Sequence, residues 1–142
     1  MYARIDLSKT NYNKLSNYSL LTIQDFEISE LQNLYREYCN YKKFRSVMPI
    51  FDSEFTDLKN DVIGYYDNQQ LVGFSLLRRF DNENVEAIQF AWDYKNPKLR
   101  LGINSLKSEC AHFKELGFKY LYLGAADEYK SKIDGFEVLG TL

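Results

Sequence analysis

The sequence has few cysteines, one histidine and no long apolar run. Cys39 and Cys110 belong to no paired motif, so we expect two reduced, partly buried thiols and no disulfide framework. His112 has no cysteine or carboxylate at metal-ligand spacing, which predicts no metal site. No segment approaches the roughly 20 apolar residues that span a bilayer, and the start of the chain lacks the apolar core of a signal peptide. We therefore expect a cytoplasmic protein that does not act on membranes.

The sequence also lacks a strong charge of either sign. Its formal net charge is -2, so binding to nucleic acid or to an anionic membrane would need a local basic patch. Aromatic residues are abundant instead, with twelve Tyr and ten Phe. A chain of 142 residues buries enough surface to fold without disulfides. We expect a single domain over residues 1–142.

The first half of the chain predicts a strand, two helices and a meander. Residues 17–23 have strand character, and a helix capped by Asp25 should follow, with apolar residues at three- and four-residue steps. A short second helix is predicted next, with Asp52 or Ser53 as its cap. Three strands joined by the polar turns DNQQ and DNEN come next, and such short connections predict an antiparallel meander.

The second half predicts a parallel crossover. A helix from about Leu101 is closed by Gly117, and the strand KYLYLG follows it. Because a long helix separates this strand from the meander, the two should be parallel neighbours. A helical turn at 128–133 and a last strand complete an α/β fold with a mixed sheet. Residues 1–16 are expected to be an extension or to add an edge strand.

Alternation along the third meander strand predicts two different faces. One face carries large side chains, namely Ile88, Phe90, Trp92 and Tyr94. The other carries Ala87, Gln89, Ala91 and Asp93. The small side chains of the second face leave room for a helix or a ligand to approach closely.

The loop after this strand carries the best candidate for a binding site. A helix that starts in a glycine loop offers free N–H groups and a positive dipole end to an anion, most often a phosphate. Gly102 has no side chain to block close approach, so residues 102–105 are predicted to form an anion cradle. The alternative is a glycine needed only for the loop's geometry. Nearby cations make this side locally basic: Lys95, Lys98, Arg100, Lys107 and Lys114.

The order of elements over about residues 18–142 resembles the GNAT acyltransferase superfamily. NQQLVGFSLL looks like the family's hairpin, and LRLGINSL like its pyrophosphate-binding loop. DYKNPKLRLGINSLKSECAHFKELGFKYLYLG is most similar to the C-terminal domain of arginyl-tRNA–protein transferases. EYKSKIDGFE is similar to an ending shared with peptidoglycan-building aminoacyl transferases of the same fold.

Two features depart from the superfamily pattern. In order, the superfamily loop has Gln or Arg, any two residues, Gly, any one residue, and then Gly or Ala. Here Leu99 stands at the position of the Gln or Arg, and Asn104 at the position of the second Gly or Ala. Arg100, one position after Leu99, could still reach a phosphate. The chain has one strand after the short helix, so the family's final strand is missing, abbreviated or replaced by the N-terminal segment.

The resemblance implies an N-acyltransferase that moves an acetyl group from acetyl-CoA to a primary amine of a small molecule or protein. It places the cofactor between the strand ending at Asp93 and the strand 119–124. The residues expected to bind it are Trp92, Tyr94, Arg100, Leu101, Gly102, Ile103, Asn104 and Ser105. The alternatives are aminoacyl transfer from charged tRNA, or an inactive GNAT-like domain that binds a ligand or a protein.

The candidate catalytic residues are those that could donate or accept a proton during the transfer. The resemblance implies that Tyr129 protonates the departing thiolate, and the alternative is a packing tyrosine. An amine must lose a proton before or during attack, so a carboxylate is the expected base. Asp93 and Glu86 are the candidates, with a structural or exposed role as the alternative for both. The oligomeric state stays open, although an aromatic-rich sheet edge could pair with a second copy.

Overall fold

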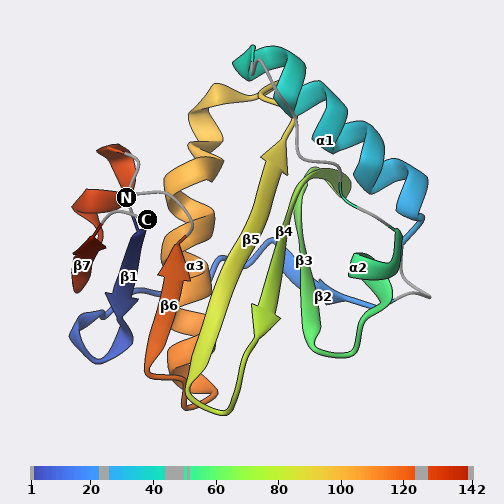
Figure 1. The fold of residues 1–142 in the computed structure, drawn as a ribbon. Coiled ribbons are helices and arrows are strands. Elements are labelled where there is room, and N and C mark those ends of the chain that lie inside the picture. The colour runs from blue at the N-terminus through green and yellow to red at the C-terminus, as the bar shows by residue number, and fades with distance from the viewer. Residues whose placement is uncertain (1, 23–25, 44–49, 51, 124–127, 141–142) are drawn as a thin grey trace.

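The computed structural model describes residues 2–22, 26–43, 50, 52–123 and 128–140, without the side chains of Tyr2, Glu128 and Tyr129. Within these residues a seven-stranded mixed sheet has the order β2-β3-β4-β5-β6-β1-β7 (Figure 1). The strands are β1 (Tyr2–Asp6), β2 (Tyr18–Leu21), β3 (Asn60–Asp67), β4 (Gln70–Arg79), β5 (Asn84–Trp92), β6 (Tyr120–Leu123) and β7 (Phe136–Gly140).

Helices cover both faces of the sheet (Figure 1). The α-helices are α1 (Ile28–Lys42), α2 (Asp52–Thr56) and α3 (Leu101–Glu115), and the short 3-10 turns are η1 (Leu7–Lys9), η2 (Pro97–Leu99) and η3 (Glu128–Lys132). One face packs on α1 and α2, and the other on α3. No helix in the described part of the chain is long and apolar enough to cross a membrane.

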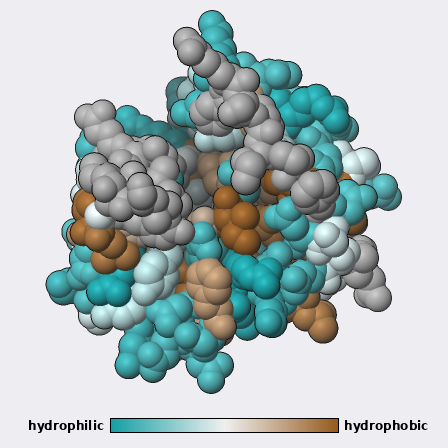
Figure 2. All heavy atoms as spheres, viewed as in Figure 1, coloured by the Kyte–Doolittle hydropathy of each residue, from teal (hydrophilic) through white to brown (hydrophobic). Residues whose placement is uncertain are grey.

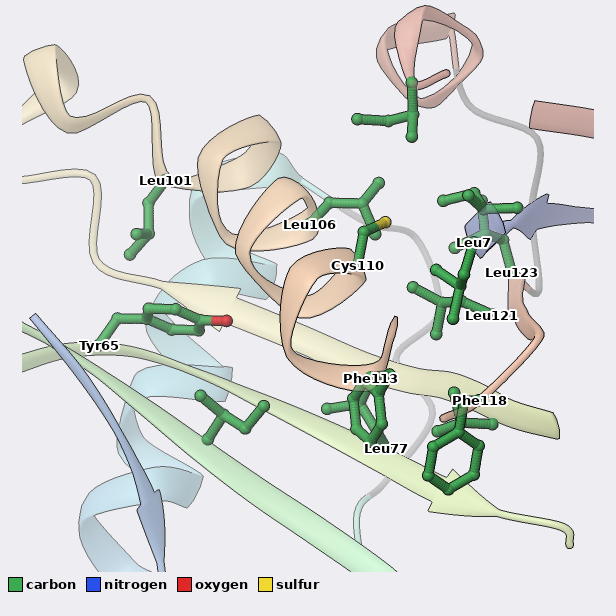
Figure 3. Close-up of a cluster of buried hydrophobic side chains, with 14 of the residues drawn as sticks. Leu7, Tyr65, Leu77, Leu101, Leu106, Cys110, Phe113, Phe118, Leu121 and Leu123 are labelled. Atoms are coloured by element: carbon green, nitrogen blue, oxygen red, sulfur yellow. The ribbon is translucent and has the colours of Figure 1, made fainter. Parts of the chain in front are cut away.

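The buried face of α3 is the stripe that the sequence predicts. Leu106, Cys110 and Phe113 are fully or almost fully buried, and Figure 3 shows them directed toward Leu77 and Leu121 of the sheet. Gly117 then adopts a φ of 95°, and the N–H of Phe118 donates to the carbonyl of Phe113 at 3.0 Å. This is the left-handed helix ending expected at a glycine.

The meander and the crossover are confirmed. Strands β3, β4 and β5 are antiparallel neighbours, and β5 pairs with β6 in parallel after the excursion through α3. The predicted second helix is present, but Asp52 and Ser53 lie inside it and do not precede it as a cap. The predicted cap of α1 lies outside the described residues, since Asp25 is not among them; Glu27 occupies the N-cap position with no side-chain hydrogen bond.

The N-terminal strand lies inside the sheet and not at its edge. β1 runs between β6 and β7 and is antiparallel to both. Ala3 and Ile5 on β1, and Leu7 at the start of η1, are completely buried. The N-terminal segment thus supplies an interior strand of the sheet, whereas the sequence predicted an extension or an edge strand. Alternating apolar residues predict a strand but do not say which strands will flank it.

A bulge in β5 changes the predicted faces. Leu77 is opposite Ala87 and Leu76 is opposite Gln89, so Ile88 is an inserted residue. Val85 and Ala87 before the bulge pack on the α3 side, as do Phe90 and Trp92 after it, whereas Ile88 packs on the α1 side. The prediction that Ile88 shares a face with Phe90 and Trp92, and that Ala87 lies opposite them, is therefore wrong.

The bulge also marks the point where two parallel strands separate. β6 pairs with β5 only from Asn84 to Ala87, while β5 continues to Trp92. Beyond Ala87, the described residues provide no strand on that side of β5. The sheet therefore opens between β5 and β6, with the start of α3 close to the free end of β5 (Figure 1).

Candidate active site

A pocket of about 240 Å³ lies at the free end of β5, and we call it the β5 pocket. It is enclosed by the last turns of α1, by the end of β5 and by the start of α3, which converge there (Figure 1). Its lining residues are Tyr38, Lys42, Phe90, Trp92, Tyr94, Arg100, Gly102 and Ile103. Five of the eight residues predicted to bind the cofactor are in this set. Figure 2 shows hydrophobic surface in the middle of the viewed face, over β5, with hydrophilic side chains around it.

Aromatic rings form one wall of the β5 pocket. The ring of Tyr94 stacks on Tyr41 at a centroid distance of 4.0 Å and lies 4.2 Å from Trp92. The ring of Tyr38 is nearly parallel to the ring of Tyr94, with their centroids 5.8 Å apart. The ammonium group of Lys42 lies 5.6 Å from the centroid of the Tyr94 ring. Tyr41 is 62% exposed, so part of this stack faces solvent. Flat rings beside a cation are suited to a planar group that carries negative charge.

The start of α3 provides the opposite wall. Arg100 adopts a left-handed φ of 45° and α3 begins at the next residue. The first hydrogen bond of the helix is from the N–H of Asn104 to the carbonyl of Arg100, so the N–H groups of the first three helical residues have no intrahelical partner. These donors and the positive end of the helix dipole fit an anion.

Gly102 has space above it. A Cβ atom built at Gly102 would meet nothing within 4 Å, and its backbone is not left-handed. Neither the backbone conformation nor packing within the described residues requires a glycine here; the left-handed residues of the loop are Tyr94 and Arg100. This observation favours the anion cradle over a purely geometric role for the glycine.

Three of the residues predicted to bind the cofactor do not line the β5 pocket. Leu101 is buried against β4, close enough that a Cβ at Gly73 would lie 2.9 Å from its Cδ2 atom. Ser105 is buried, and its hydroxyl donates to the carbonyl of Gly102. The side-chain amide of Asn104 donates to the carbonyl of Leu99 at 2.8 Å and so ties the helix to the preceding loop. The two residues that depart from the superfamily loop are thus joined to each other.

Trp92 presents an unpaired donor at this site. Its side chain lines the β5 pocket and the residue is 4% exposed. Its indole N–H has no acceptor among the described residues. A buried N–H without a partner costs about 1–3 kcal/mol. An acceptor atom of a ligand in the pocket would remove that cost.

The predicted proton-transfer residues do not meet in the β5 pocket. Asp93 borders a separate polar cavity of about 420 Å³, and its carboxylate accepts the N–H of Lys95 at 3.0 Å. Glu86 borders a third cavity, beside Phe80 and Tyr122, at the other end of β5. The side chain of the third candidate, Tyr129, lies outside the described residues.

The basic side of the molecule is smaller than the sequence suggests. Lys114 donates to the carbonyl of Thr10, Lys107 lies over the ring of Tyr12, and Lys95 lies 3.9 Å from the carboxylate of Asp93. Arg100 keeps its predicted place, and a cation that the sequence did not single out, Lys42, joins it from α1. The described residues contain no group of three or more His, Cys, Asp or Glu side chains that could hold a metal ion.

Sequence reasoning missed two parts of the site. Tyr38, Tyr41 and Lys42 lie in the last turns of α1, where apolar periodicity and a terminal cation indicate packing and helix termination. Glu109 is buried on the side of α3 that faces the sheet, where it accepts hydrogen bonds from Tyr65 at 2.5 Å and Ser75 at 2.7 Å. Nothing in the sequence signals this burial, because a helical glutamate is usually exposed.

The comparison with known families gives one clear match. The family described as "Arginine-tRNA-protein transferase, C terminus" matches residues 17–134 of this chain. No curated protein gives a significant match.

Solved structures share the fold at low identity. The C-terminal domain of a protein named as a lysylphosphatidylglycerol synthetase from Agrobacterium fabrum has a TM-score of 0.66 and 15% identity, over 88% of this chain and 46% of that one. A GNAT-family acetyltransferase from Novosphingobium aromaticivorans has a TM-score of 0.64 and 16% identity, over 96% and 58%. A GNAT-family acetyltransferase from Elizabethkingia anophelis with acetyl-CoA bound has a TM-score of 0.55 and 17% identity, over 83% and 71%.

The chain thus spans less than half of the Agrobacterium structure and somewhat more than half of the Novosphingobium one. These similarities establish a GNAT-like fold, as the sequence predicts. Together with the match over residues 17–134, they show that the chain belongs to the family of the C-terminal domain of arginine-tRNA-protein transferases.

Proposed function

We propose that this chain transfers an aminoacyl group from a charged tRNA to a primary amine, with the donor bound at the β5 pocket. Transfer of an acyl or aminoacyl group is the chemistry common to the family and to the GNAT-fold relatives. The observation that carries the proposal is the meeting of stacked aromatic rings, two cations and the start of α3 in one pocket.

Three features favour tRNA as the donor. The family match itself names a tRNA-dependent transferase. The loop departs from the usual pyrophosphate pattern at Leu99 and Asn104, which are hydrogen-bonded to each other. Unpaired bases of RNA stack on aromatic rings while Lys and Arg meet their phosphates, and the β5 pocket supplies both kinds of side chain in Tyr38, Tyr94, Lys42 and Arg100.

Acetyl-CoA is the second candidate donor, and Gly102 favours it. The space above Gly102 and the unpaired N–H groups of the first helical turn would suit a pyrophosphate. One GNAT-family relative has acetyl-CoA bound. Trp92, Tyr94, Arg100, Gly102 and Ile103 would hold this donor, and the core-facing Leu101 and Ser105 would act only by fixing the helix.

The transfer step needs little covalent participation by the protein. The ester bond between the amino acid and the ribose breaks, an amide bond to the amine forms, and the proton lost by the amine ends on the ribose hydroxyl. The contribution of the protein is to position the donor and to move that proton. Of the proposed bases, Asp93 is the better placed, because it directly follows Trp92, whereas Glu86 is at the far end of β5.

Calorimetric titration distinguishes the donors. We expect arginyl-tRNA to bind more tightly than uncharged tRNA, and acetyl-CoA to give no heat at high micromolar concentration. Incubation with labelled arginyl-tRNA and a peptide with a free α-amino group should then label the peptide. Binding of acetyl-CoA without any tRNA binding would support the second candidate and refute the first. If neither donor binds, both are refuted.

Replacing Gly102 by alanine separates binding from folding. The added methyl group meets no protein atom, and alanine suits a helix better than glycine by up to about 1 kcal/mol. The melting temperature should therefore stay the same or rise slightly, while donor affinity falls about tenfold as the methyl group blocks close approach. Thermal unfolding and donor titration of the same sample measure both effects.

Glu115→Ala at the other end of α3 is the matched control, because it changes helix propensity away from the β5 pocket. It should leave donor affinity unchanged. A Gly102→Ala variant that binds donor like the wild type would show that the space above Gly102 is not used.

A further inference from the structure

Glu109 is a carboxylate inside the hydrophobic core. It is 4% exposed and lies in the middle of α3, on the side that faces β3 and β4. Its Oε2 atom accepts hydrogen bonds from the hydroxyl groups of Tyr65 on β3 and Ser75 on β4. Burial raises the pKa of Glu109 to about 7, against the opposing effects of the two hydroxyl groups and of the charge of Lys130 on η3.

This cluster touches the β5 pocket in two ways. The hydroxyl group of Tyr65 lies 3.4 Å from the carbonyl of Ser105, in the second turn of α3. The ring of Tyr65 is also edge-on to Phe90, with centroids 6.5 Å apart, and Ser75 is the cross-strand partner of Phe90. Because Phe90 lines the β5 pocket, Glu109 is linked through its two donors to a wall of the pocket and to the helix that starts there.

We propose that Glu109 is a positioning residue for the β5 pocket, and that it takes up a proton when an anionic donor binds there. This effect on the donor rests on the proposed function. Gly102 precedes Glu109 by seven residues, which is about 10 Å at 1.5 Å per helical residue. At that distance, in an effective dielectric constant of about 20, the negative charge of an ionised Glu109 weakens the binding of an anion at the start of α3 roughly tenfold.

The protonation state also changes the hydrogen bonds. A carboxylate only accepts, so both hydroxyl groups donate to it. Once protonated, Glu109 can donate to Tyr65, whose own proton is then free to bond the carbonyl of Ser105. The start of α3 is therefore tied to β3 differently in the two states.

Neighbouring groups do not share this titration. Burial raises the pKa of Tyr65 well above its usual value of 10 and raises that of Cys110. Burial lowers the pKa of His112, one turn further along α3, below its usual 6.5. The charge of Lys130 on η3 lowers the pKa of Glu109 and so opposes the effect of burial. Ser75 has no charge to change. A transition near pH 7 at this site therefore belongs to Glu109.

Trp92 reports this transition, because it is the only tryptophan in the chain and lines the β5 pocket. The fluorescence of the wild type, titrated from pH 5.5 to 8.5, should change with a midpoint near pH 7. Glu109→Gln should abolish the change, and the exposed Glu115→Gln on the same helix should preserve it. A wild type without the transition, or the same transition in Glu109→Gln, would overturn the proposal.

Tyr65→Phe provides a second variant if Glu109→Gln does not fold. It keeps the carboxyl group but removes the hydroxyl that links it to Ser105, so the fluorescence change should disappear. An unchanged transition would show that Glu109 does not act on the pocket through Tyr65.

Donor affinity separates this inference from the proposed function. Wild-type affinity for arginyl-tRNA should fall roughly tenfold more between pH 6 and pH 8 than that of Glu109→Gln. Equal pH dependence in the two proteins would refute coupled proton uptake. A wild type that binds no donor at any pH would refute the proposed function instead, and the titration of Trp92 would then decide whether Glu109 positions the pocket.

Discussion

Reversing the charges of Lys42 and Arg100 together is expected to weaken donor binding by a factor of about one hundred or more. The two cations come from different elements, α1 and the residue before α3, and both line the β5 pocket. Each substitution removes an attraction to phosphate and adds a repulsion, so a loss of at least tenfold per position is reasonable for phosphate contacts. Filter binding of arginyl-tRNA at low salt measures the loss.

A double variant with the same change in net charge is the control. Lys9 and Lys59 are exposed and lie outside the β5 pocket, so Lys9→Glu with Lys59→Glu should weaken binding only slightly. The slope of affinity against salt concentration should fall in the pocket variant and stay near the wild-type value in the control. Equal losses in the two variants would mean that tRNA responds to the overall charge and that the β5 pocket is not its site.

Replacing Glu109 by glutamine is expected to change how stability depends on pH. The pKa of Glu109 is raised from 4.5 to about 7 in the folded state by burial. Its contribution to stability is therefore fully present below pH 4.5 and is lost as the pH rises through 7. Glutamine does not titrate, so its contribution does not depend on pH. Between pH 4.5 and pH 8.5 the free energy of unfolding of the variant should therefore rise by about 3 kcal/mol relative to that of the wild type.

Urea unfolding at a series of pH values measures this difference. Glu115→Gln is again the matched control, because Lys14 lowers the pKa of Glu115. The contribution of Glu115 to stability is present above its unfolded pKa and is lost on acidification. As the pH rises, the free energy of unfolding of Glu115→Gln should therefore fall relative to that of the wild type, which is the opposite of the change expected for Glu109→Gln. Parallel curves for the wild type and Glu109→Gln would show that Glu109 keeps its charge when buried.

The fold was largely predictable because its signals are local. Short polar turns force neighbouring strands to be antiparallel, and a long helix between two strands permits a parallel pair. The position of β1 is not local, since Ala3 pairs with Leu123 and Val138 at the other end of the chain. The bulge at Ile88 is invisible for a different reason: a one-residue insertion leaves the types of residue in the strand unchanged and alters only their register.

The site was predictable where one segment supplies it. Trp92, Tyr94, Arg100 and Gly102 lie within eleven consecutive residues, and a glycine at a helix start has a known chemical meaning. The contribution of α1 comes from more than fifty residues earlier, where Tyr38 is indistinguishable from a core residue. The burial of Glu109 depends on the hydroxyl groups of Tyr65 and Ser75, which only the folded sheet brings to it.

The inserted position of β1 has a consequence for folding order. Along the chain β1 precedes the other strands of the described sheet, whereas both of its neighbours, β6 and β7, follow all of them. We therefore expect the meander and the first two helices to form before Ile5 and Leu7 are buried against the C-terminal strands. Closing so long a loop is slow compared with forming local turns. We therefore expect the half of the sheet that holds β5 to assemble before β1 pairs with β6 and β7.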